Sequence, residues 1–356
     1  MIKRLEIENY GCIRHAEIKP TPLHALIGPS DVGKSTMLKA IVALSQFIRV
    51  DEHHEAAPLI PMKARDTMTL TVEFAGSLGF NVGFAPRSQT LETYVRESMQ
   101  GEWLGYRHVT PDFRWASEEP QEVAEFARQI RGRLECAMVH LQNQALHRDS
   151  PLITDLAPVL LEEDGHGLAG VYDRIMARGD DSFDLITHRI RSYFPWVGGV
   201  EVSTVSQVTK NLFVRSLDGQ RIPAKHVGVG VLRMLAWEAL RYSDRPRMLL
   251  VEEPEAGLSP ALIKVVMQLL RELTTDSQRP SQVLIATRSP LVAAELEALE
   301  ITLVTRTTRE GTRVAPLADH PDYVAPAQRL PPGLRWLDLA DGVMSAPAGG
   351  TVRTRA

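Results

Sequence analysis

GPSDVGKST at residues 28–36 decides the fold, because it fits the pattern G-x-x-x-x-G-K-[ST]. It follows the apolar run LHALI at residues 23–27 and leads into STMLKAIVALSQFI at residues 35–48, which predicts a strand, a glycine-rich turn and a helix. Glycines let successive backbone N–H groups curl around a phosphate, and the following helix presents its positive N-terminus to the same anion. The stretch therefore predicts a phosphate-binding loop, or P-loop, in an α/β sheet.

Side chains of this loop have separate predicted roles. Lys34 is expected to reach the β- and γ-phosphates of a nucleoside triphosphate, and the Ser35 hydroxyl is expected to bind Mg²⁺. A plain strand-to-helix turn is the alternative, but the position of the match between a strand and a helix argues against it. The predicted nucleotide-binding residues of the loop are Gly28, Ser30, Asp31, Val32, Gly33, Lys34, Ser35 and Thr36.

MLLVEEPEAGLSP at residues 248–260 is the second informative stretch. Its apolar start predicts a buried strand that delivers Glu252 and Glu253 to the C-terminal edge of a sheet, where ligands of open α/β sheets bind. Glu252 is expected to hold the Mg²⁺ shell, directly or through water, and Glu253 to orient and deprotonate the attacking water. An apolar strand ending in two glutamates is common by itself, but with a P-loop it completes the constellation that nucleotide hydrolysis requires.

Predicted strands and helices alternate near both ends of the chain, which favours a mixed, mostly parallel α/β sheet with flanking helices. Short β-like pieces between residues 67 and 95 predict an antiparallel patch, and a helix is expected over residues 290–300. We therefore predict a P-loop NTPase fold divided into a first lobe at 1–150, a helical lobe at 151–195, a second lobe segment at 196–340 and a flexible tail at 341–356.

Composition restricts the class of protein. The chain has 356 residues, of which 44% are hydrophobic and 24% are charged, as in ordinary globular domains. Its formal net charge of −4 means that any nucleic-acid contact must come from a local patch. Two cysteines, Cys12 and Cys136, without a CxxC motif fit a reducing, cytoplasmic setting. No apolar run reaches the roughly 18 residues that span a bilayer, so a membrane partner is not expected.

Two basic pairs and four histidines are expected to be solvated side chains without a functional role. The basic pairs Arg131/Arg133 and Arg189/Arg191 are expected to be solvated helix faces, with contact to nucleic-acid phosphate as the alternative. No acid or thiol partners recur at ligand spacing around the histidines, which are therefore expected to be solvated loop side chains and not metal ligands. These histidines are His53, His54, His147 and His166.

Taken together, the opening IKRLEIENYGCIRHAEI, the P-loop and EEPEAGLSP resemble the ABC-type AAA ATPases of the RecF, SMC and OLD (overcoming lysogenization defect) group. The resemblance covers residues 1–48 and 227–304 and is weaker between them. It implies an ABC-type ATPase fold, ATP and Mg²⁺ as cofactors, and a D-loop at residues 257–260. Many members have Asp where this chain has Glu252 and His where it has Ser259, and Glu252 keeps the charge.

The resemblance places two further motifs, each with a departure. The signature loop, which in the family reaches across a dimer to the partner's ATP, corresponds to residues 228–231. Gly228 and Gly230 are therefore expected to bind nucleotide. In the family a serine often stands where this chain has Gly228, and the alternative interpretation of this turn is a simple loop-to-helix connection. At the switch position, Arg288 stands where relatives usually have His. Arginine stays protonated and offers a planar fork of donors, so Arg288 is expected to stabilise γ-phosphate charge unless it is only a surface residue.

The family also has a glutamine after a core strand that touches the metal or the water. In this chain it corresponds to Gln142 or Gln144 of VHLQNQ, with Gln142 as the first choice. Tyr10 is the nearest aromatic candidate for stacking on adenine, with core packing as an equal alternative.

The resemblance implies a switch ATPase that forms an ATP-dependent homodimer or higher oligomer and controls a protein effector or a nucleic acid, in DNA repair or anti-phage defence. A hydrolysis-deficient nucleotide-dependent scaffold is the main alternative, suggested by Gly228 and Arg288. A transporter ATPase subunit is disfavoured because the signature is not Leu-Ser-Gly-Gly-Gln, and an SMC-like DNA tether because no long heptad run occurs. An OLD-type nuclease is disfavoured because about 50 residues after Val304 are too few for a TOPRIM domain, so the effector is expected to be a separate protein.

Overall fold

The computed structural model describes residues 1–49, 66–76, 78–88, 90–96, 104–109, 121–151, 161–206, 208–308 and 311–320. The predicted tail at 341–356, His53 and His54 lie outside these residues.

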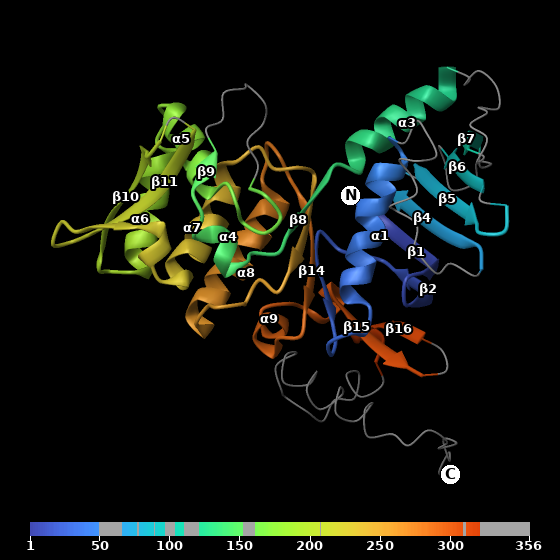
Figure 1. Ribbon diagram of the computed structural model, residues 1–356. Helices are drawn as coiled ribbons and strands as arrows, with labels where there is room; N and C mark the ends of the chain where they lie inside the picture. The colour runs from blue at the N-terminus through green and yellow to red at the C-terminus, as the bar shows by residue number, and fades with distance from the viewer. Residues whose placement is uncertain are drawn as a thin grey trace, which may run out of the picture.

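A six-stranded sheet forms the centre of the described molecule (Figure 1). Its strand order is β16-β15-β3-β14-β13-β8, and the neighbouring strands from β15 to β8 are parallel, while β16 pairs antiparallel with β15. The predicted mixed, mostly parallel sheet is confirmed. The strands are β3 (Leu23–Ile27), β8 (Cys136–Val139), β13 (Met248–Glu252), β14 (Gln282–Thr287), β15 (Ile301–Thr307) and β16 (Gly311–Pro316).

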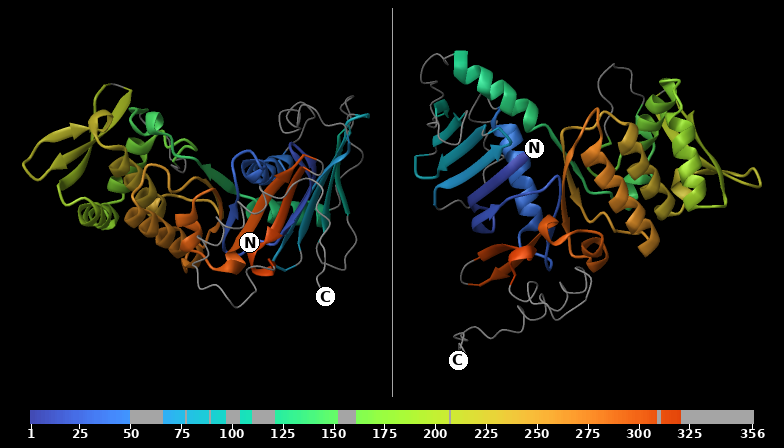
Figure 2. Two further views of the ribbon diagram at one scale, coloured as in Figure 1. Left: turned by 90° about the horizontal axis from the view of Figure 1, so that it is seen from below. Right: turned by 180° about the vertical axis from the view of Figure 1, so that it is seen from behind.

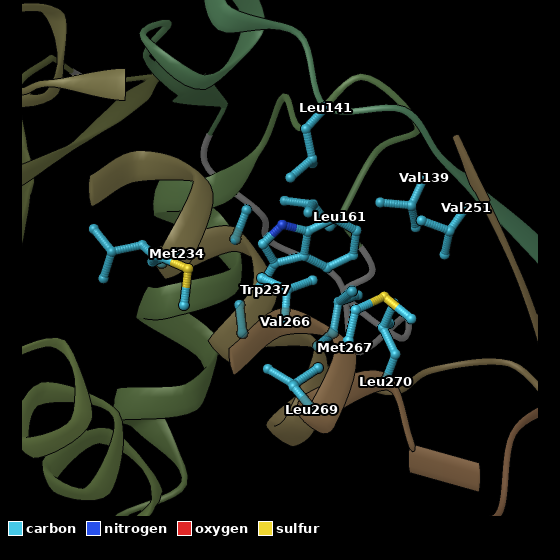
Figure 3. Packing of buried hydrophobic residues seen from close by; sticks show 14 of the residues in the cluster. Val139, Leu141, Leu161, Met234, Trp237, Val251, Val266, Met267, Leu269 and Leu270 are labelled. Carbon is cyan, nitrogen blue, oxygen red and sulfur yellow. The ribbon is translucent and has the colours of Figure 1, made fainter. Parts of the chain in front are cut away.

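Alternate residues of the parallel strands supply two hydrophobic cores, one on each face of the sheet. Leu249 and Val251 of β13 join a core with α7 (Val229–Tyr242) and α8 (Pro260–Thr275), whereas Leu250 joins a core with α1 (Lys34–Phe47). Trp237 of α7, 1% exposed, packs among the apolar side chains of α8, β8 and β13 (Figure 3). Because helices cover both faces, these strands are continuous apolar runs and not alternating ones.

A second sheet covers the face of α1 that points away from the central sheet, with strand order β2-β1-β4-β5-β6-β7 and antiparallel pairing throughout. The predicted antiparallel patch is therefore present and extends back to the first strand of the chain. The helix α3 (Gln121–Arg133) packs against its far strands. The strands are β1 (Ile2–Tyr10), β2 (Ile13–Ile18), β4 (Met68–Phe74), β5 (Gly79–Ala85), β6 (Thr90–Arg96) and β7 (Leu104–Val109).

A third, smaller sheet lies at the opposite end of the molecule from the antiparallel sheet (Figure 2). It consists of β9 (Ser150–Pro151), β10 (Val197–Thr204), β11 (Thr209–Ser216) and β12 (Arg221–Pro223). Its inner face packs on α5 (Leu168–Ala177) and α6 (Ser182–Tyr193), and these helices join the same hydrophobic core as α7. The structure thus contains the predicted small helical region, while its boundaries at 151–195 stay a prediction.

The predicted helix over residues 290–300 is wrong in its extent. The helix α9 (Pro290–Ala294) ends after five residues, and a separate 3₁₀ turn, η3 (Ala298–Glu300), follows. Glu297 and Glu300 form a capping box that starts this new turn, with the Glu297 N–H donating to Glu300 Oε2 at 2.9 Å. The remaining short elements are α4 (Asn143–Leu146), η2 (Ala224–His226) and η4 (Leu317–Asp319).

Candidate functional site

The carboxyl ends of four neighbouring parallel strands meet at one edge of the central sheet. β3 leads into the P-loop, β14 leads into Arg288, β13 ends at Glu252, and β8 leads towards Gln142. Because the strand order is β3-β14-β13-β8, these segments lie side by side. This edge is where ligands bind in open α/β sheets.

The backbone of the P-loop needs glycine at two positions. A Cβ atom on Gly28 would lie 2.0 Å from the carbonyl oxygen of Val304. Gly33 has φ +110°, and a Cβ atom there would lie 2.7 Å from Thr312 Oγ1. Asp31 also has a positive φ of 61°, which is uncommon for a residue with a side chain. The loop therefore has a tightly constrained shape.

The Lys34 side chain folds back onto the carbonyl groups of its own loop. Its ammonium group donates to Gly28 O at 2.9 Å and to Pro29 O at 2.5 Å. Burial lowers the pKa of Lys34, and the nearby Glu253 carboxylate opposes that effect. Gly33, the N-cap of α1, has no side chain to satisfy the first N–H groups of the helix, which are left to a ligand or to water. These features suit an anion that replaces the two carbonyl partners of Lys34.

Side chains of the β15–β16 hairpin hydrogen-bond to the backbone of the P-loop, a role that the sequence did not predict. Thr312, 1% exposed, donates from Oγ1 to Val32 O at 2.7 Å. Arg306 donates from Nη1 to Asp31 O at 3.1 Å. Both bonds hold carbonyl groups of the loop, and such groups are costly to bury unpaired.

Glu252 has the features of a cation ligand. Its Oε2 lies 3.3 Å from Nδ1 of His140, a residue that sequence reasoning did not select. Its Oε1 is buried and has no hydrogen-bond partner within the described part of the chain. An unpaired buried carboxylate oxygen is costly, and Mg²⁺ or a water molecule on Mg²⁺ would satisfy it. The residues present therefore fit a Mg²⁺ ion held by Glu252 and by Ser35 at the start of α1.

Glu253 and Arg288 lie together beside the P-loop. The Arg288 Nε atom lies 3.8 Å from Glu253 Oε1, and Nη1 donates to Ser30 Oγ at 3.5 Å. Glu253 itself has φ +45°, and its N–H donates to Ala286 O at 3.0 Å. A non-glycine residue in this conformation is strained unless its surroundings hold it, as often occurs at functional sites. The geometry thus brings the predicted switch residue, the second acid and the P-loop to one place.

Glu255 is a third acid at this edge, to which sequence reasoning gave no role. Thr287 Oγ1 donates to Glu255 Oε1 at 2.6 Å, while Oε2 is buried without a partner among the described residues. Burial raises the pKa of Glu255. Since Thr287 also accepts from the Ser289 N–H at 2.9 Å, Glu255 links the segment just before the D-loop to the switch segment. Its position two residues after the paired acids was the available signal.

The predicted signature residues lie at the start of α7. Gly228 is the exposed N-cap of that helix, and Gly230 lies beside Gly257 of the D-loop, whose carbonyl oxygen is 3.7 Å from an ideal Gly230 Cβ. Gln142 is exposed at the N-cap of α4. Since α7 and α1 cover opposite faces of the central sheet, the roles of Gly228, Gly230 and Gln142 in nucleotide binding stay predictions.

Arg233 connects these segments inside one chain. It is 5% exposed in α7, and its Nη2 donates to Leu141 O at 2.8 Å and to Asn143 Oδ1 at 2.9 Å. A Cβ atom on Gly257 would lie 3.1 Å from its Nε. Burial lowers the pKa of Arg233, while Glu253 and Glu255 favour its charged form. The guanidinium group therefore ties the signature helix to the Gln142 loop and to the D-loop.

The other side chains considered from the sequence have structural partners. His147 Nε2 lies 3.2 Å from Val227 O, and His166 Nδ1 lies 2.9 Å from Glu162 Oε1. Both histidines are half-buried and not fully solvated as predicted, because these contacts hold them against the loops. Tyr10 packs against the core of the antiparallel sheet, in line with its structural interpretation.

Family models match most of the chain. The model described as "AAA ATPase domain" matches residues 1–146, and the model described as "AAA domain, putative AbiEii toxin, Type IV TA system" matches residues 133–294. The chain is also 42% identical over 41 residues to an OLD nuclease from Thermus scotoductus, a match that covers 12% of this chain and 8% of that protein.

Solved structures of SMC heads are similar in fold. An SMC head bound to the C-winged helix domain of ScpA matches with a TM-score of 0.58 at 13% identity, over 88% of this chain and 97% of that chain. An SMC head with a coiled coil and joint from Pyrococcus yayanosii matches with a TM-score of 0.53 at 10% identity, over 96% and 99% of the two chains. At these identities the similarity establishes the fold alone.

The motifs, the sheet order and these matches identify the chain as an ABC-type AAA ATPase of the RecF/SMC/OLD type. ATPase chemistry is supported at the level of this family. Among the described helices, none is long and apolar enough to cross a bilayer.

Proposed function

We propose that this protein is a cytoplasmic switch that binds and hydrolyses ATP at the carboxyl edge of the central sheet. One observation carries the proposal: Arg288 lies within 3.8 Å of Glu253 and within 3.5 Å of Ser30 in the P-loop. A phosphate-binding loop and a solvent-accessible carboxylate in one site are what phosphoryl transfer to water requires.

ATP binding replaces contacts that the protein makes with itself. The Lys34 ammonium leaves Gly28 O and Pro29 O for oxygens of the β- and γ-phosphates, and the N–H groups at the start of α1 point at the same anion. Charge-assisted hydrogen bonds to phosphate are stronger than bonds to neutral carbonyls, so the exchange favours the bound state.

Hydrolysis then uses the paired acids and the arginine. Glu253 accepts a proton from a water molecule whose oxygen bonds to the γ-phosphorus, while the bond from that phosphorus to the β,γ-bridging oxygen breaks and ADP leaves. Arg288 stabilises the charge on the γ-phosphoryl oxygens. Ser35 and Glu252 would hold a Mg²⁺ ion, which would supply positive charge to stabilise the phosphates when bound.

The partner in self-association is a second copy of the chain, in an ATP-dependent homodimer or higher oligomer. Gly228 and Gly230 present the N-terminus of α7 on the face of the sheet opposite α1, which suits a contact with the nucleotide of another protomer. Arg233 would carry that contact to the Gln142 loop and the D-loop, because it hydrogen-bonds the first and packs on the second.

The output is control of a protein effector or of nucleic acid, in DNA repair or anti-phage defence. The family description that names a toxin of a type IV TA system and the short match to an OLD nuclease support this assignment. A nucleotide-dependent scaffold without turnover is the second candidate, because Gly228 lacks a hydroxyl and Arg288 cannot shuttle a proton.

Steady-state ATP hydrolysis by the wild type and by Glu253→Gln, with oligomeric state followed by mass photometry with and without ATP and Mg²⁺, tests the proposal. Glu272→Gln is the matched control, because Glu272 is an exposed acid of α8 paired with Arg241. We expect turnover in the wild type and the control, and an ATP-bound dimer without turnover in Glu253→Gln. ATP binding without turnover in all three proteins would instead establish the scaffold.

A further inference from the structure

Two arginines and one acid lie on the outer face of the third sheet, and Arg191 from the last turn of α6 reaches Gly198 and Gly199 of β10; we call these four side chains the arginine face. It consists of Arg191 from the end of α6, Glu201 of β10, Arg215 of β11 and Arg221 of β12. Arg215 pairs with Arg221 across the strands, and Glu201 belongs to the same outward-facing row. Residues between them, such as Val214, point into the core. The charges therefore share one surface of a sheet whose other surface is covered.

Two guanidinium groups of the arginine face meet above a glycine. An ideal Cβ atom on Gly199 would lie 3.4 Å from Arg215 Nη2 and 4.0 Å from Arg191 Nη2. Arg191 donates to the neighbouring carbonyl of Gly198. Two cations this close repel each other unless an anion lies between them or beside them. A small residue at position 199 leaves the room for that arrangement.

Among the described residues, Glu201 is the acid that forms ion pairs with this cluster, and it does so with two arginines. Its carboxylate lies 3.5 Å from Arg215 Nε and 3.0 Å from Arg221 Nε. Arg215 and Arg221 remain 52% and 44% exposed. Three cations against one anion leave a net positive face on a chain whose formal net charge is −4. This patch is therefore a local feature and not part of a generally basic surface.

Arg189 shows the contrast within the same helix. Its Nη1 donates at 3.1 Å to the fully buried Glu238, whose other oxygen accepts from Tyr193 OH at 2.9 Å. The predicted basic pair Arg189/Arg191 therefore divides into one structural arginine and one arginine on the exposed face.

Aromatic groups accompany the arginine face. The Arg221 guanidinium lies 3.6 Å from the centroid of the Phe213 ring on the same row. Trp196, immediately before β10, is 42% exposed, and its carbonyl accepts from the Leu217 N–H at 3.0 Å at the end of β11. Phe213 is only partly exposed and lies under Arg221, so Trp196 is the aromatic side chain that a base could reach at this end of the sheet. Exposed aromatic rings and arginines together hold unpaired bases and their phosphates.

We propose that the arginine face binds single-stranded nucleic acid. The forks of Arg191, Arg215 and Arg221 contact successive phosphates, and Trp196 stacks on a base. A duplex keeps its bases stacked inside and leaves Trp196 unused, which favours the single strand. The proposal deepens the proposed function by naming the partner and its position. It rests on that function only for the coupling step below.

The chain connection supplies a path from this face to the ATP site. β12 carries Arg221 and ends at Pro223, the turn η2 spans residues 224–226, and Gly228 then begins the signature helix. Occupation of the arginine face therefore acts on the segment that is proposed to reach the partner's nucleotide.

Fluorescence anisotropy of a labelled oligothymidylate, measured without ATP, tests the binding site. Contact with three phosphates predicts a slope of about −2 for log affinity against log salt, or roughly 20-fold weaker binding at 200 mM than at 50 mM salt. Arg215→Gln and Arg221→Gln should each weaken binding at least about fivefold and flatten the slope by about 0.7. Glu201→Gln should strengthen binding, because it removes the acid that competes with phosphate. Arg128→Gln, which removes an exposed arginine paired with Glu125 in α3, should change nothing.

Several results would overturn the proposal: Arg215→Gln binding like Arg128→Gln, weaker binding by Glu201→Gln, preference for duplex DNA, or equal competition by polyglutamate. Circular dichroism checks that the variants fold, and the opposite sign expected for Glu201→Gln does not depend on lost stability. The binding assay needs no hydrolysis, so an oligonucleotide-binding protein without turnover refutes the proposed function alone. With turnover, the oligonucleotide should change the ATPase rate of the wild type and not that of Arg215→Gln, whose basal rate should be unaltered.

Discussion

Replacing Thr312 by valine tests whether the β15–β16 hairpin holds the P-loop in its nucleotide-binding shape. Thr312 is 1% exposed, and its hydroxyl donates to the carbonyl of Val32 at 2.7 Å. Valine keeps the branched shape and removes this bond. Because Val32 is itself buried, its carbonyl would then lack a partner in the position that the bound loop requires.

The expected cost follows from that geometry. Leaving a buried carbonyl unpaired costs about 1–3 kcal/mol. If the loop must keep this position to hold phosphate, a cost near the middle of that range weakens ATP binding by about tenfold or more, since roughly 1.4 kcal/mol corresponds to a factor of ten. Thr312→Ser keeps the hydroxyl and should recover most of the affinity.

Titration with a fluorescent ATP analogue, together with thermal unfolding, separates positioning from general stability. Thr302→Val is the matched control, because Thr302 is 3% exposed in the same hairpin and its hydroxyl lies 2.9 Å from His24 Nε2, not at the P-loop. Both variants should unfold more easily, but Thr312→Val alone should bind ATP weakly. Unchanged ATP affinity in Thr312→Val, or an equal loss in Thr302→Val, would refute the reasoning.

Four further predictions concern the site and the core. Gly28→Ala should abolish ATP binding, since its Cβ would lie 2.0 Å from a backbone oxygen, whereas Gly83→Ala, with nothing within 4 Å, should bind ATP normally in the same titration. Glu252→Gln should raise the Mg²⁺ concentration needed for half-maximal hydrolysis several-fold, and an unchanged Mg²⁺ titration would remove Glu252 from the metal site. Arg288→Ala should lower the hydrolysis rate by at least about tenfold, with partial recovery in Arg288→Lys, and an unaltered rate would count against the γ-phosphate role. Burial lowers the pKa of His24 from 6.5 to about 4, so the unfolded chain binds more protons between these values. Stability should therefore fall by about 2 kcal/mol from pH 7 to pH 5, and urea unfolding of His24→Gln should lack that contribution.

The predicted parts of the site were those with a local signal. The P-loop is nine consecutive residues between a strand and a helix, and the acid pair follows a four-residue apolar strand, so periodicity and spacing were sufficient. The order of the strands in the sheet could not be derived from local patterns. The pairing of β8 with β13, for example, joins Val139 to Val251 across more than a hundred residues of chain.

The supports of the site had no such signal. Thr312 lies 280 residues from its partner Val32, and nothing in GTRVAP distinguishes that threonine from any other strand residue. His140 was overlooked because Glu252, its neighbour in space, lies more than a hundred residues further along the chain, at the end of β13. Glu255 sits in the recognised motif, but its importance comes from burial beside Thr287, which spacing along one strand does not show. These supporting residues could not be predicted because their roles depend on contacts with residues that are distant in the sequence.

In the function that we propose, Arg288 at the switch position would connect nucleotide binding to activation of Glu253. In the structure, Arg288 lies beside Glu253 and Ser30, and the Lys34 ammonium group donates to carbonyl groups of its own loop, so both cations have partners within the chain. A γ-phosphate carries more charge than these partners and attracts both cations. In this proposal, Arg288 would leave Glu253 when it turns to the phosphate, and because an arginine cannot take a proton, the freed carboxylate would be the group that accepts it from water. One movement would thus remove the arginine from the acid and place it on the phosphate. Loss of Arg288 should therefore impair turnover more than nucleotide binding, where Lys34 and the helix N-terminus remain.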